Sequence, residues 1–68
     1  MKELNLHGLY HHQVELTVEN FILLHEPPIR IITGNSPTMQ TIVKKVLQRH
    51  GYQHQNENDW NLGSWYIT

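Results

Sequence analysis

The sequence predicts a small two-layer α/β sandwich with the element order β-α-β-α-β-β. Two segments, 11–24 and 37–50, carry apolar residues at the spacing of an amphipathic helix. A nearly continuous β-branched run at 29–33 lies between them and is typical of a central strand. Two helices are too few to cover both faces of a four-stranded mixed sheet. We therefore expect both helices on one face and an open, polar face opposite.

The first strand is expected at 3–7, where polar and apolar residues alternate until Gly8. The helix at 11–24 follows and ends before a pair of prolines. Leu16 and Leu23 lie outside its main apolar stripe, so this helix is broadly apolar or partly covered. The stripe consists of Val14, Val18, Phe21 and Ile22.

The second helix, at 37–50, has the clearest boundaries in the sequence. Ser36 is a good N-cap, Pro37 suits the first helical position and Gly51 suits a left-handed stop. Its apolar stripe consists of Met39, Ile42, Val43, Val46 and Leu47.

The end of the chain is expected to form a β-hairpin with strands at 52–55 and 63–67. The final strand should run antiparallel to the strand before it, because the connection between the two is short. We expect Trp65 to lie in the core and Trp60 to lie exposed in the connecting loop.

Composition indicates one thin-cored domain, 1–68, and excludes several kinds of site. The 68 residues include no cysteine, which excludes disulfides, thiolate zinc sites and a cysteine nucleophile. No apolar run approaches the roughly 20 residues of a membrane span. We expect no membrane association, and with no apolar leader in the sequence we expect a cytoplasmic protein.

Charge is segregated along the chain although the net charge is only −1. No acidic residue lies between Pro27 and Asn56, the interval that holds four of the five lysines and arginines. This interval is either an ordinary solvated surface or a local basic patch. In the second interpretation, the residues that contact backbone phosphates are Lys44, Lys45 and Arg49.

The candidate binding site is the rim where the two parallel strands end. Ligands bind outside the carboxyl ends of such strands, and the second loop leads into a helix N-terminus that favours phosphate. We expect His7 and the loop amides to hold one phosphate. The alternative is that Ser36 only caps its helix and Gly34 only turns the chain. The candidate residues are His7, Gly8, Thr33, Gly34, Asn35 and Ser36.

The six histidines do not predict a metal centre. No acidic ligand stands at metal-site spacing from them, and solvated or helix-capping histidines are the simpler interpretation. We therefore expect no resident metal and no cofactor.

The segment Leu4-Asn5-Leu6-His7-Gly8 resembles the Leu-Asp-Leu-His-Gly signature that opens the Smr (small MutS-related) domain. Ile31 to Ser36 stands where that family carries a His/Thr-Gly-x-Gly loop. The resemblance covers essentially the whole chain. It implies a β-α-β-α-β-β sandwich similar to the C-terminal domain of translation initiation factor 3. It also implies binding of DNA or RNA and, in some members, nicking of DNA or cleavage of RNA.

Two departures from the Smr signature bear on activity. The aspartate of the signature is Asn5 here, and an amide is neither a general base nor as good a metal ligand as a carboxylate. The second loop glycine is Ser36. The resemblance therefore favours binding of nucleic acid over cleavage.

Two alternatives stay open. One is an endonuclease in which His7 is the catalytic acid/base, Asn5 matches only by position and a divalent metal takes part. The other is a protein-interaction module or homodimer that uses the open face of the sheet.

Overall fold

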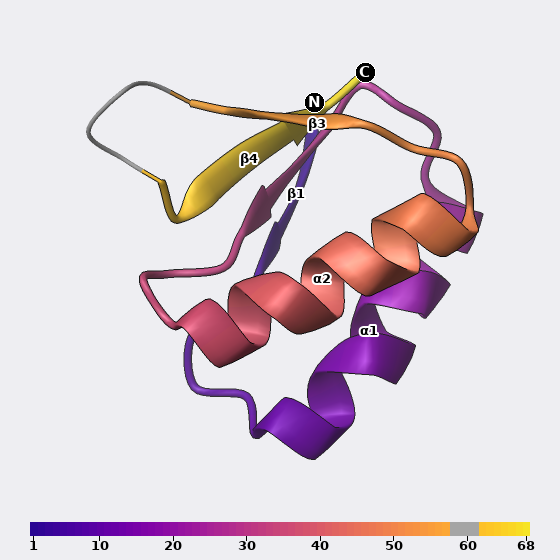
Figure 1. Ribbon diagram of the computed structural model, residues 1–68. Coiled ribbons are helices and arrows are strands. Elements are labelled where there is room, and N and C mark those ends of the chain that lie inside the picture. The colour runs from indigo at the N-terminus through magenta and orange to yellow at the C-terminus, as the bar shows by residue number, and fades with distance from the viewer. Residues whose placement is uncertain (58–61) are drawn as a thin grey trace.

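The computed structural model describes residues 1–57 and 62–68 and has the expected α/β element order (Figure 1). The expectation for Trp60 falls outside these residues. The elements are β1 (Lys2–Asn5), α1 (His11–Leu24), β2 (Ile29–Ile32), α2 (Pro37–Arg49), β3 (His54–Asn56) and β4 (Ser64–Ile67).

The strands form one mixed sheet in the order β1-β2-β4-β3. β1 and β2 are parallel because the crossover through α1 joins them. β4 runs antiparallel to both β2 and β3, which confirms the predicted direction of the last strand. Ile31 of β2 pairs with Trp65 of β4, whereas Arg30 pairs with Tyr66 on the opposite face.

One face of the sheet shares a single hydrophobic core with both helices. Trp65 is only 2% exposed, which confirms its predicted place in the core. α1 and α2 pack side by side against each other (Figure 1). This shared core supports the expectation that both helices cover the same face. The core consists of Leu6, Val14, Val18, Ile22, Ile29, Ile31, Met39, Val43, Val46, Leu47, Trp65 and Ile67.

Most strand boundaries lie within one residue of the prediction, but two differ by two residues because local hydrogen bonds turn the chain. β1 ends at Asn5, where the side-chain Oδ1 accepts the His7 N–H at 2.9 Å. β3 begins at His54 instead of Tyr52. The Tyr52 N–H donates to the Leu47 carbonyl at 2.9 Å and so closes the end of α2, with Gly51 at a φ of 76°.

The outer surface of α1 carries exposed leucines. Leu16 is 63% exposed and Leu23 is 67% exposed, whereas Val14 and Val18 on the inner side are fully buried. Leu16 and Leu23 therefore lie outside the buried side of α1, and no part of the described chain covers them. Neither α1 nor α2 has the length and apolar character needed to cross a bilayer.

Candidate functional site

The loops after β1 and β2 meet at one edge of the sheet. The parallel pairing continues to this edge, where the Leu6 N–H donates to the Ile32 carbonyl at 2.9 Å. The exposed His7 ring lies directly against Gly34, since a Cβ at Gly34 would be 2.9 Å from His7 Nε2. The structure thus brings together the two motifs that the sequence paired. We call this edge, formed by His7, Gly8 and Thr33 to Ser36, the rim.

Two features of the rim favour glycine at position 34, and the backbone conformation is the stronger of them. The Gly34 φ of 71° lies in the left-handed region, which residues with a Cβ rarely adopt. A Cβ would also come within 2.9 Å of the His7 ring, which is exposed and would have to shift. Gly8 has a similar φ of 85° but has open space around it, so only the backbone conformation favours glycine there.

Gly63 holds the loop after β2 in place. This residue was not identified from the sequence. Its carbonyl accepts the N–H groups of Thr33 at 2.7 Å and Gly34 at 3.1 Å. The buried Thr33 hydroxyl lies 3.2 Å from the same carbonyl. A Cβ at Gly63 would be 2.6 Å from the Gly34 oxygen. The only sequence signal for this contact is a glycine at the start of the last strand.

Gln40 also supports the rim, and the sequence did not reveal this role. Its side-chain Nε2 donates to the Gly34 carbonyl at 2.9 Å and to the Leu62 carbonyl at 3.3 Å. α2 therefore holds the loop between β2 and α2 against the start of β4. A glutamine on the polar side of a helix gives no pattern from which this role could be read.

The hydrogen-bond donors left for a ligand are fewer than the sequence suggested. The Gly34 N–H, which we expected to face a phosphate, donates to Gly63 instead. The Ser36 hydroxyl caps α2 by accepting the Met39 N–H at 3.2 Å. The N–H groups of Asn35 and Ser36 have no partner within 1–57 and 62–68. No acid lies in the first turn of α2, so these two donors stand at the positive end of an uncompensated helix dipole.

The surroundings of His7 do not fit a divalent metal. Asn5 uses its Oδ1 to hold the His7 backbone N–H, so its amide forms a turn. In the described part of the chain, no three histidine, aspartate or glutamate side chains converge as a ligand set. These surroundings support a role for the His7 ring as a hydrogen-bonding group.

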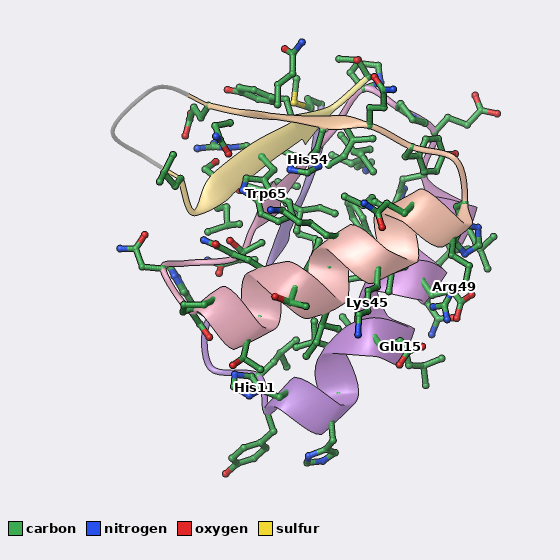
Figure 2. The ribbon with its side chains drawn as sticks, viewed as in Figure 1. His11, Glu15, Lys45, Arg49, His54 and Trp65 are labelled. Carbon is green, nitrogen blue, oxygen red and sulfur yellow. The ribbon has the colours of Figure 1, made fainter. Side chains whose placement is uncertain are left out.

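The three predicted basic contacts do not gather at the rim. Arg49 Nη1 pairs with Glu15 of α1 at 3.0 Å, and Figure 2 shows the two side chains meeting at the far end of α2. An α-helix rises about 1.5 Å per residue, so Arg49 lies about 20 Å along the helix from Ser36. Lys45 also points toward α1 (Figure 2). Lys44 Nζ lies 5.9 Å from the centroid of the Trp65 ring.

The open face of the sheet is organised around Arg30. Its guanidinium donates to Glu3 at 2.9 Å, to both carboxylate oxygens of Glu57 at 2.8 Å and to the Ser64 hydroxyl at 2.9 Å. The Tyr66 hydroxyl donates to Glu57 at 3.2 Å. Hydrogen bonds from Ser64, Arg30 and Tyr66 hold the pKa of the Glu57 carboxyl below its ordinary value. We call these five residues the Arg30 network.

Comparison of the chain with family models, with curated proteins and with solved structures finds no match.

Proposed function

We propose that the protein binds the phosphate backbone of nucleic acid at the rim. The observation that carries the proposal is the His7 ring packed against Gly34, beside two unpaired N–H groups at the start of α2. An imidazole N–H and two backbone N–H groups are suitable donors for one phosphate. The resemblance of the two rim segments to the Smr signature supports nucleic acid as the source of that phosphate.

The proposed binding is weak and does not depend on base sequence. Few hydrogen-bond donors reach the rim. Two of the basic residues between Pro27 and Asn56 already form ion pairs, Arg49 with Glu15 and Arg30 with Glu3 and Glu57. Lys44 and Lys45 have no carboxylate partner in the part of the chain that the structure describes. Contacts to phosphates alone give affinity without sequence choice.

No observation favours the two alternative functions over binding. A nuclease would need a group to orient His7 or to hold a metal, and Asn5 is engaged with the backbone. A protein interface on the open face would have to cover the Arg30 network, whose polar groups already pair with one another.

The proposal is tested by the affinity for a fluorescently labelled single-stranded oligonucleotide, measured by anisotropy at several salt concentrations. Replacing His7 with alanine should weaken binding about tenfold, as expected for one hydrogen bond to a charged group. Contacts to two or three phosphates give a slope of log K against log salt of about −1.4 to −2.1.

The matched control for this experiment is His25→Ala. His25 caps the opposite end of α1 and contacts Phe21 instead of the rim. Its replacement should leave the affinity unchanged. Equal affinity of wild type and His7→Ala would contradict binding at the rim.

A further inference from the structure

A second candidate site lies at the other end of α2 from the rim. A shallow pocket there is lined by Gln48, Tyr52, Gln53 and His54. Gln48 lies about 18 Å along the helix from Ser36, given the rise of an α-helix. The pocket is therefore separate from the rim, and none of the residues assigned to the rim lines it.

Two rings of this pocket are fixed by the fold. His54 stacks on Trp65 with the ring centroids 4.2 Å apart and the planes inclined by 22°. The buried Trp65 is itself anchored, because its Nε1 donates to the Leu62 carbonyl at 2.7 Å. Tyr52 packs against the hydrophobic core. Rigid rings lose little conformational freedom when they stack on a planar ligand.

Two side-chain amides stand beside these rings with free hydrogen-bonding groups. Gln48 and Gln53 are exposed, and neither side chain hydrogen-bonds to any residue that the structure describes. A primary amide presents a donor and an acceptor side by side, which matches the edge of a nucleobase.

The charges near the pocket are compatible with a nucleotide. Burial, together with the neighbouring Lys44 ammonium, lowers the pKa of the His54 imidazole and so favours the neutral ring. The Lys44 ammonium lies close to the stacked pair, with Nζ 5.9 Å from the Trp65 ring centroid. It could meet a phosphate attached to a base in the pocket.

We propose that this pocket binds one nucleobase, which stacks on the exposed ring surface of Tyr52 or His54 and hydrogen-bonds at its edge to Gln48 and Gln53. The base belongs either to a free nucleotide or to a nucleic-acid strand that also reaches the rim. The second source rests on the function proposed above, whereas the pocket itself does not.

The experiment is a titration of the labelled protein with adenosine, followed by the NMR signals of backbone and side-chain amides. Adenosine has no phosphate, so this result is independent of the rim. The side-chain amides of Gln48 and Gln53 and the signals of His54 should shift together. Absence of these shifts at saturating adenosine would overturn the proposal.

Glutamine variants provide a matched control that keeps the ring stack intact. The double change Gln48→Ala and Gln53→Ala should weaken adenosine binding at least about fivefold, as expected for loss of base-edge contacts. Gln55→Ala is the control, because Gln55 pairs with Tyr66 and so lies on the opposite face of the sheet. Equal weakening by both variants would contradict the assigned pocket.

Two further ligands distinguish the sources of the base. A short single-stranded oligoadenylate should bind more tightly than adenosine monophosphate if a strand spans the pocket and the rim. His7→Ala should then remove that gain and leave adenosine binding unchanged. Equal affinity for both ligands assigns the pocket to a free nucleotide and counts against the function proposed for the rim.

Discussion

The contact between His7 and Gly34 is the residue-scale feature on which the rim depends. Gly34→Ala should destabilise the fold by about 1–2 kcal/mol, because alanine is strained at a φ of 71° and its Cβ would displace the exposed His7 ring. Gly8→Ala should cost only the backbone strain of about 1 kcal/mol, since nothing lies near its Cβ. Urea denaturation measures both values.

A double-mutant cycle separates the clash from the backbone strain. In the His7→Ala background the ring is absent, so Gly34→Ala should cost no more than Gly8→Ala. If Gly34→Ala still costs clearly more than Gly8→Ala in the His7→Ala background, the additional cost does not come from the His7 ring.

Gly63 gives a sharper residue-scale prediction. A Cβ there would lie 2.6 Å from a backbone oxygen, which cannot move aside as a flexible side chain can. Gly63→Ala should therefore destabilise the protein by about 2–4 kcal/mol and disturb the amide signals of Thr33 and Gly34. A change below about 0.5 kcal/mol, measured by thermal or urea unfolding, would contradict the close packing of the two loops.

At the scale of elements, the two helices differ in how much of their apolar surface they bury. Leu47 of α2 is fully buried, whereas Leu16 of α1 is 63% exposed. Leu47→Ala should cost about 2–5 kcal/mol, and Leu16→Ala should change stability by less than about 0.5 kcal/mol. Unfolding curves of this matched leucine pair test the assignment, and similar losses for both would contradict it.

The Arg30 network on the sheet makes the stability of the fold depend on pH. Because folding lowers the pKa of Glu57, its ionised form stabilises the fold above the ordinary value of 4.5. That contribution is lost as the pH falls from 4.5 through the lowered pKa. Wild type should therefore exceed Glu57→Gln in stability at pH 7, and the difference should shrink below pH 4.5.

Unfolding free energies measured from pH 7 to pH 3 test this dependence. Glu26→Gln is the control, since Glu26 is exposed and has no ion-pair partner in the described chain. A constant difference between wild type and Glu57→Gln across the range would show that the network does not act through ionised Glu57.

At the scale of the whole molecule, the sequence predicts the elements well because local signals agree with the fold. Ser36, Pro37 and Gly51 mark the ends of α2 through capping chemistry that acts within a few residues. The nearly continuous β-branched run at 29–33 likewise predicts a central strand, which is the place of β2 in the sheet.

The details of the rim could not be predicted in the same way. Gly63 and Gln40 reach it across 29 and 6 residues of chain from Gly34 respectively, and no periodicity reports such contacts. The pairing of Arg49 with Glu15 is also a tertiary contact, and it engages a side chain that the sequence predicted to contact phosphate.

The central claim, that a phosphate binds between His7 and the start of α2, is tested most directly by an NMR titration with a short single-stranded oligonucleotide. The amide signals of Asn35 and Ser36 and the ring signals of His7 should shift together, and added salt should reverse the shifts. The Gly34 amide, which donates to Gly63, should respond less. Shifts confined to other parts of the molecule, with Asn35, Ser36 and His7 unchanged at saturation, would contradict the claim.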